Sequence, residues 1–244
     1  MKDAELTTSK LEQHQKITRQ PNNLMLPTPE KLQIINLLEA NLKERDYFAS
    51  QVDRCKGKLH VLTHPFYHEE FNGYPEIPGY AKARDILIKS CITHDIPLVI
   101  FEESSKCRTL SLKIPEIPGI LYVVKTEGAS NYLEYDHYQN QKKLTALFKW
   151  AGVSRIVAGG QYMFLRKFPQ DVKNPHDRRT LNDLGFLKHL RPNAKKWIDQ
   201  RIIPEKCAGG IASNFLISGF DVSLSPVSSP HNFYLGHCKI VQGS

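Results

Sequence analysis

The sequence of 244 residues is poor in cysteine, methionine and tryptophan, and it contains no long apolar run. Its five cysteines form no C-x-x-C pair and their number is odd, which argues against both a disulfide framework and a zinc ribbon, and for reduced thiols. No stretch approaches the roughly 18 consecutive apolar residues of a membrane-spanning helix. The first residues are polar and lack the apolar segment of a secretory signal. These absences predict a cytoplasmic protein with no membrane partner.

Glycine motifs that bind phosphate are missing as well. Gly159 and Gly160 follow an apolar run, but neither a G-x-G-x-x-G pattern nor a P-loop lysine accompanies them. A dinucleotide or nucleoside triphosphate site is therefore not expected, and the sequence predicts no cofactor.

The composition that remains is ordinary for a globular protein, but the positive charge is unevenly distributed. Hydrophobic residues make up 41% and charged residues 24% of the chain, and its net charge is +8. The segment 166–206 alone holds eleven Lys and Arg residues against five acidic residues. One interpretation is a solvated excursion, since charge runs usually face water. The other is a surface that binds phosphate, nucleic acid or an acidic partner.

Five short apolar runs, rich in β-branched residues, predict the strands of one sheet. Their near-continuous apolarity is typical of strands buried on both faces of a parallel sheet. They lie at 59–63, 97–101, 120–124, 155–158 and 221–224. Helical patterns between them lie at 80–93, 137–151 and 207–218. We therefore predict an α/β, Rossmann-like fold: a doubly wound, mostly parallel sheet of five or six strands with helices on both faces.

The domain organisation follows from the remaining segments. Residues 1–27 are polar and without apolar periodicity, so we expect a mobile N-terminal arm. A helix is predicted from Thr28 as N-cap, with Pro29 in its first position, to about Ser50. Its apolar face would hold Leu32, Ile35, Leu38 and Leu42. Residues 28–244 would then form a single α/β domain that carries the basic segment 166–206 as an insertion.

Candidate functional residues lie where predicted strands end, because ligands of open parallel sheets bind beyond the carboxyl ends of the strands. Lys125 directly follows the third strand, where it would pair with a carboxylate, fix an anion or simply reach water. Cys207 opens the last predicted helix, where backbone N–H groups and nearby cations favour a thiolate. The alternative for Cys207 is an inert core cysteine. The other residues after the strand ends include Thr63, His64, Glu102, Glu103, Glu127, Gly159, Gly160 and Gln161.

Two segments resemble isochorismatase-like (nicotinamidase-type) cysteine hydrolases, and together the resemblance covers about half of the chain. The string CAGGIASNFLISGFDVSLS, at 207–225, is similar to the segment in which the nucleophilic cysteine opens a helix that leads to a Gly-aromatic pair and a strand. The string VVKTEGASNYLEYDHYQNQKKLTALFKWAGVSRIVAGG, at 123–160, resembles the family's run of strand, catalytic lysine, Ser-aromatic pair, helix and strand. The fold that this family implies agrees with the one predicted above.

The resemblance implies hydrolysis of a small amide or related acyl compound. Cys207 would be the nucleophile, and Lys125 would stabilise the thiolate and the developing oxyanion. The family's proton acceptor is an Asp at the end of its first strand; here that position is Thr63, and His64 is the nearest group able to take the proton. The residues expected to bind the substrate are Glu127, Gly159, Gly160 and Gln161. The basic insertion would cover the site as a lid.

The run from His64 to His68 also resembles the HPxxH metal-binding run of nicotinamidases. Glu69 or Glu70 would be needed as a third ligand, and two ligands do not make a site, so no metal is predicted.

Two other functions stay open at this point. One is a non-catalytic binding module, a degenerate member of the same family, that engages an anionic partner through 166–206. The other is a nucleic-acid-binding protein, although the chain contains no recognised nucleic-acid-binding motif.

Overall fold

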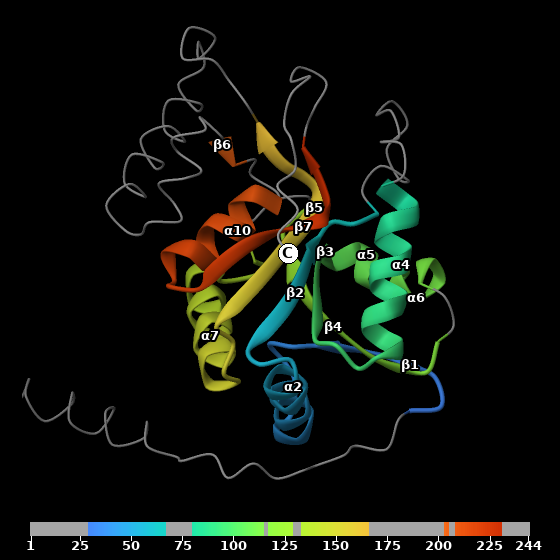
Figure 1. Cartoon of the computed structure of the whole chain (residues 1–244). Helices are drawn as coiled ribbons and strands as arrows, with labels where there is room; N and C mark the ends of the chain where they lie inside the picture. The colour runs from blue at the N-terminus through green and yellow to red at the C-terminus, as the bar shows by residue number, and fades with distance from the viewer. Residues whose placement is uncertain are drawn as a thin grey trace, which may run out of the picture.

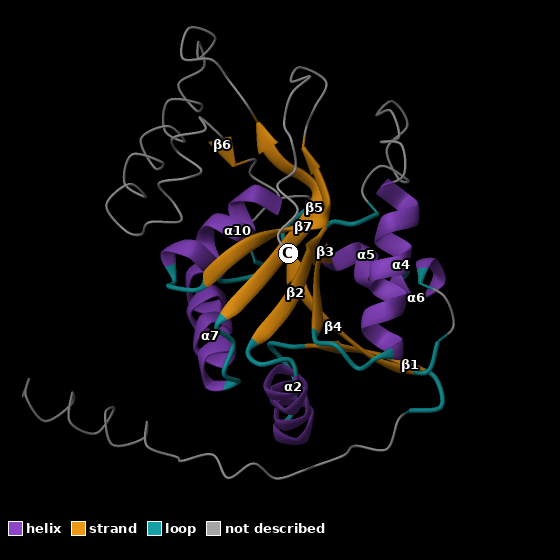
Figure 2. Ribbon diagram, in the orientation of Figure 1, coloured by secondary structure: helices purple, strands orange, loops and turns teal. Residues whose placement is uncertain are grey.

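The computed structural model describes residues 29–66, 80–114, 117–128, 133–165, 203–204 and 208–230, and these form one sheet with helices on both faces (Figures 1 and 2). The strands are β1 (Leu32–Asn36), β2 (Lys58–Thr63), β3 (Leu98–Glu103), β4 (Gly119–Thr126), β5 (Arg155–Leu165), β6 (Ile203–Pro204) and β7 (Asp221–Pro230). The helices are α2 (Leu42–Arg54), α4 (Tyr80–Thr93), α5 (Ser104–Cys107), α6 (Leu110–Lys113), α7 (His137–Trp150) and α10 (Ala208–Ile217). None of the helices in these ranges has the length and apolarity needed to cross a membrane.

The sheet is mostly parallel, as predicted. Among the described residues, six strands run parallel in the order β1-β4-β3-β2-β5-β7, and only the two-residue β6 is antiparallel, against the far end of β5. The five predicted strands are β2, β3, β4, β5 and β7, and their parallel pairing is confirmed. From β2 the chain builds toward β3 and β4, and then crosses back to place β5 on the other side of β2. The strand order therefore reverses between β2 and β5, where such sheets bind ligands.

The helices divide between the two faces and each face has its own apolar core. One core joins α2, α7 and α10 to the sheet through Phe48, Phe148 and Phe215. The other joins α4 and α6 through residues such as Ile88 and Leu110. Figure 2 shows the resulting three layers, with α2, α7 and α10 on one side of the strands and α4, α5 and α6 on the other. Strands covered on both faces explain the unbroken apolar runs in the sequence.

The helix predicted from Thr28 to Ser50 is wrong in its first half. Residues Leu32–Asn36 form the edge strand β1, paired in parallel with β4, and helix α2 begins only at Leu42. The helix start is set by a capping box. The Asn41 side chain accepts a hydrogen bond from Glu44 N at 3.1 Å, and the Glu44 carboxylate accepts one from Asn41 N at 2.7 Å.

Gly57 connects the turn after α2 to the turn after α7, and we expect its replacement by alanine to destabilise the protein. Its φ is +77°, and its carbonyl oxygen accepts hydrogen bonds from the backbone N–H groups of Ser154 and Arg155 at 2.9 and 3.1 Å. A Cβ at this position would collide with the Ser154 side chain and lie 2.9 Å from the Gly152 carbonyl oxygen. Strain and overpacking together should lower the free energy of unfolding by about 2–4 kcal/mol, measured by denaturant titration.

Gly152 is the matched control for this substitution. It also has a positive φ, +82°, but a Cβ there would meet no atom within 4 Å. Gly152→Ala should therefore cost only the backbone strain, about 1 kcal/mol. Equal losses for the two variants would show that the close contact at Gly57 has no energetic weight.

Candidate functional site

His64 is the residue that the fold places most distinctively. It follows the last residue of β2, whose partners Phe101 and Gly160 lie on the two neighbouring strands, so it stands at the carboxyl edge where the strand order reverses. Its side chain is fully buried and its φ is +44°, a left-handed conformation that few residues other than glycine adopt. The backbone is held there by a 2.8 Å hydrogen bond from His64 N to Phe101 O. Such strained, buried polar residues cluster at functional sites.

A chain of hydrogen bonds fixes the imidazole ring. His64 Nε2 lies 2.9 Å from Thr126 Oγ1, and Thr126 Oγ1 in turn donates to the Gly128 carbonyl oxygen at 2.9 Å. A threonine hydroxyl has a single hydrogen, so it accepts from His64 and the proton sits on Nε2. In the neutral ring, Nδ1 is then the nitrogen that carries no hydrogen. Thr126 is itself buried, which keeps this bond away from water.

Two carboxylates stand at the end of β3, beside His64. Glu103 accepts a hydrogen bond from Ser105 Oγ at 2.8 Å, and this bond is the main reason that the pKa of Glu103 lies below its usual value. The Lys106 ammonium, 3.2 Å from Glu103, and the His64 ring lower that pKa further. Glu102 is buried, and its Oε1 accepts a hydrogen bond from Glu103 N at 2.9 Å. The edge of the sheet thus presents a histidine close to an ionised carboxylate.

Lys125, the predicted catalytic lysine, lies near the end of β4 and pairs with a carboxylate. Its Nζ is 3.6 Å from Glu39 Oε1, in the connection that follows β1. Its positive charge also acts on the Cys107 thiol, whose pKa is nevertheless raised to about 11 by burial and by Glu102. Lys125 is thus placed beside Glu39 and Cys107, while its neighbour Thr126 contacts His64.

The four residues expected to bind substrate do not occupy equivalent positions. Glu127 follows β4 and is exposed, and its charge raises the pKa of His137 against a larger lowering by burial. Gly159, Gly160 and Gln161 lie within β5, which continues to Leu165 instead of ending at Ala158 as predicted. Gly160 pairs with Thr63, has a φ of +145° and marks a register irregularity against β7. It therefore brings a backbone without a side chain next to His64.

Cys207 lies outside the described residues, as do residues 1–28 and most of the basic segment 166–206. The helix predicted to start at Cys207 is α10, which begins at Ala208 and ends at Ile217. The remaining cysteines in the described ranges are poorly ionised. Burial raises the pKa of Cys91 to about 12 and, with Glu102, that of Cys107 to about 11, and burial also raises the pKa of Cys55.

Sequence reasoning missed Thr126, which orients His64. The only signal in the sequence was its position directly after Lys125. Neighbours in a strand point to opposite faces, so Thr126 was expected on the face of β4 opposite to that of Lys125. His68, with Glu69 and Glu70, falls outside the described residues. Within the described ranges, no three His, Cys, Asp or Glu side chains are grouped so that they could hold a metal ion.

Comparison with known proteins gives no further assignment: no family model, no curated protein and no solved structure matches the chain.

Proposed function

We propose that this protein hydrolyses a small amide or a related acyl compound, with Cys207 as nucleophile, His64 as proton shuttle and Lys125 as the cation that stabilises developing negative charge. The observation that carries the proposal is the placement of His64. A buried histidine at the reversal point of a parallel sheet, with one ring nitrogen fixed by a threonine hydroxyl, has the arrangement expected of an oriented general base.

The direction of α10 supports the proposed nucleophile. The helix ends at Ile217, four residues before Asp221. Asp221 begins β7 and pairs with Arg155, the first residue of β5, so the end of α10 is close in sequence to the amino edge of the sheet. Its ten residues span about 15 Å and lead back toward the opposite edge of the sheet. The first residue, Ala208, therefore belongs to the carboxyl edge, the edge at which His64 stands. Cys207 immediately precedes it in the sequence, at the end of the helix where N–H groups favour a thiolate.

The proposed reaction has two half-steps, and His64 serves both. It removes the thiol proton of Cys207 as the sulfur adds to the substrate carbonyl carbon. When the carbon–nitrogen bond breaks, the same proton passes to the leaving amine and a thioester remains. A water molecule, deprotonated by His64, then adds to the thioester and releases the carboxylic acid and the free thiol. No oxidant, reductant or metal ion is needed for this sequence of steps.

Lys125 enters the proposal with one condition. Its ammonium would stabilise the oxyanion that forms on the carbonyl oxygen, because a fixed positive charge acts strongly where water is excluded. In the structure the ammonium pairs with Glu39 at 3.6 Å and is partly exposed. Thr126, the neighbour of Lys125 in β4, is the residue that contacts His64, and neighbours in a strand point to opposite faces. Catalysis would thus require the Lys125 side chain to leave Glu39 and reach over the carboxyl edge of the sheet toward the substrate.

Thiol reactivity tests the proposal directly. With brief iodoacetamide treatment near neutral pH, followed by mass mapping, Cys207 should be alkylated fastest, because only thiolates react. Cys91 and Cys107 should stay largely unmodified at that pH, since their pKa values lie at about 12 and about 11. Their labelling should rise only as the pH approaches those values, while Cys207 should already be at its plateau.

The control for this experiment is the same labelling after denaturation, where all five thiols should react alike. A Cys207 that is protected until the protein unfolds would be a packing residue and would remove the nucleophile from the proposal. Cys207→Ser should abolish the fast phase and leave the slow labelling of the other cysteines unchanged.

A further inference from the structure

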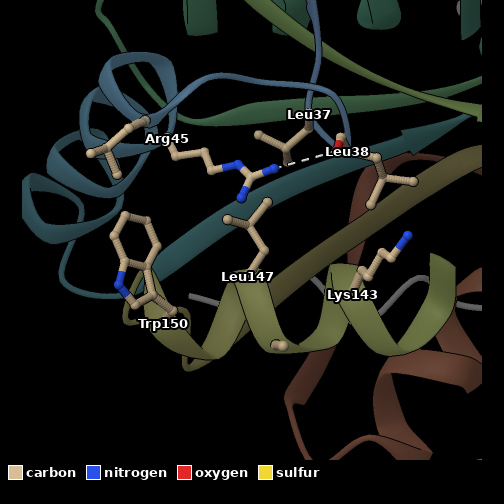
Figure 3. A pocket seen from close by; sticks show the side chains of 8 residues that line it. Leu37, Leu38, Arg45, Lys143, Leu147 and Trp150 are labelled. Carbon is tan, nitrogen blue, oxygen red and sulfur yellow. Dashed lines mark hydrogen bonds between the residues drawn. The ribbon is translucent and has the colours of Figure 1, made fainter. Parts of the chain in front are cut away.

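A groove unconnected with the candidate site runs between the connection after β1 and helices α2 and α7 (Figure 3). Its volume is about 630 Å³. The residues that line it are Leu37, Leu38, Leu42, Arg45, Lys143, Ala146, Leu147 and Trp150. It shares none of these with the residues grouped around His64. Any ligand bound here would therefore be recognised separately from a substrate at the sheet edge.

The groove exposes two large apolar side chains at its rim. Leu42 is 69% exposed and Trp150 is 41% exposed, although both are large apolar side chains. Leu147 lies between Trp150 and Lys143 in the view of Figure 3, on the face of α7 that turns toward α2. Apolar patches with a polar rim mark binding surfaces for proteins or ligands.

Both charged residues of the lining are cations. Figure 3 shows Arg45 reaching from α2 across Leu147, with Lys143 on the other side. The guanidinium donates to the Leu38 carbonyl oxygen at 3.4 Å, while its buried Nε has no acceptor among the described residues. Neither cation pairs with a carboxylate in the part of the chain that the structure describes. The groove thus offers N–H donors and positive charge with little internal compensation.

We propose that this groove binds an acidic amphipathic helical segment of a partner protein. Its apolar residues would pack on Leu147 and Trp150, and its carboxylates would bind Arg45 and Lys143. Arginine is suited to this role because its planar fork binds a carboxylate with two parallel hydrogen bonds. The sign of the partner follows from charge complementarity, since the lining contains two cations and no acid.

The shape of the groove favours a peptide segment over a small molecule. A small ligand is usually enclosed over most of its surface, whereas here Leu42 and Trp150 of the lining are exposed to solvent. A helix laid between two helices uses such an open groove by inserting apolar anchors at i, i+3, i+4 and i+7. The other side of that helix would stay in water.

Selection from a displayed library of random peptides, each about 16 residues long, tests the proposal with the full chain as the target. We expect the enriched peptides to be acidic, with leucine, isoleucine or phenylalanine at helical spacing. Trp150 gives a local readout in a Trp197→Phe background, because the chain has only two tryptophans. Binding of a synthetic version of an enriched peptide should shift the Trp150 emission, and should weaken as the salt concentration rises from about 0.1 M to about 0.5 M.

Charge reversal supplies the decisive comparison. Arg45→Glu with Lys143→Glu should weaken peptide binding about tenfold or more. Lys43→Glu with Lys142→Glu changes the net charge equally on the same two helices but outside the groove lining, and should leave binding nearly unchanged. Enriched peptides that are neutral or basic, or that bind both double variants alike, would overturn the proposal.

Two other occupants would also overturn it, and each has its own signature. Octanoate, an apolar monocarboxylate, would shift Trp150 emission without any peptide being enriched if the groove were a small-molecule site. Self-association of the chain that the Arg45→Glu and Lys143→Glu pair abolishes would assign the groove to a second copy. Neither result depends on hydrolase activity, so failure here leaves the proposal for Cys207 and His64 intact.

Discussion

Replacement of His64 by asparagine is expected to slow the hydrolysis of p-nitrophenyl acetate by a factor of about 10²–10⁴, because the proposed mechanism loses its general base. Asparagine suits this test because it tolerates the left-handed backbone that His64 adopts. The rate should be measured across the pH range, after subtraction of the rate of a Cys207→Ser variant. In the wild-type protein, the plot of rate against pH should contain a rise caused by deprotonation of the histidine. This rise should be absent from the variant. Unchanged rates would remove His64 from the mechanism.

Thr126 separates a catalytic effect at His64 from a merely structural one. Thr126→Ser keeps the hydroxyl that accepts from His64 Nε2, and should keep the wild-type pH profile. Thr126→Val removes the acceptor, so the ring loses its fixed orientation, and the rate should fall by about tenfold or more. A shifted pH profile in Thr126→Val, restored in Thr126→Ser, identifies Thr126 as a positioning residue. Thermal unfolding of each variant checks that the fold is retained.

The sheet could be predicted because strands covered on both faces leave a simple signal. Each buried strand is a short, β-branched run bounded by helical or turn residues, and local sequence alone suffices to see it. The edge strand β1 lacks this signal. It has one neighbour, β4, and is only partly buried, so its pattern of apolar residues merged with that of the following helix.

Local chemistry near Pro29 reinforced that error. A threonine before a proline is a familiar helix start, and it outweighed the true one, the capping box formed by Asn41 and Glu44. The distance of three residues from Asn41 to Glu44 was visible in the sequence, and it would have placed the start of α2 correctly. Competing helix-start signals differ in strength. The reciprocal cap of Asn41 and Glu44 satisfies two backbone N–H groups, whereas Thr28 is a single candidate cap and Pro29 a single favourable residue at the first helical position.

The site could be anticipated only as a location. The rule that ligands bind at the carboxyl ends of parallel strands put His64, Glu103 and Lys125 among a longer series of candidates from the sequence alone. The contact between His64 and Thr126 joins residues 62 positions apart and reaches past β3, so it depends on the strand order. The positive φ of His64 also breaks the alternation that would otherwise predict where its side chain points. Neither feature has a local sequence signal.

Truncation of Phe148 to alanine is expected to cost about 3–5 kcal/mol of unfolding free energy, the usual range for a buried phenylalanine. Phe148 is fully buried in the core that α7 shares with α2, α10 and the sheet. Its ring centroid lies 6.0 Å from that of Phe48, 5.4 Å from that of Phe215 and 6.2 Å from that of Phe220. Truncation therefore removes contacts to three separate segments and leaves a cavity among aromatic rings that cannot easily close in.

Tyr138, on the same helix, is the matched control because it is 77% exposed. Tyr138→Ala should change the free energy of unfolding by no more than about 0.5 kcal/mol, since no core contact is lost. Phe148→Leu keeps most of the buried volume and should fall between the two. Denaturant titration of the three variants measures the series, and the slope of each transition shows whether unfolding stays cooperative. A loss below about 1 kcal/mol for Phe148→Ala would mean that the aromatic cluster does not hold α7 against the sheet. The cluster would then not contribute to the placement of β5 beside His64 either.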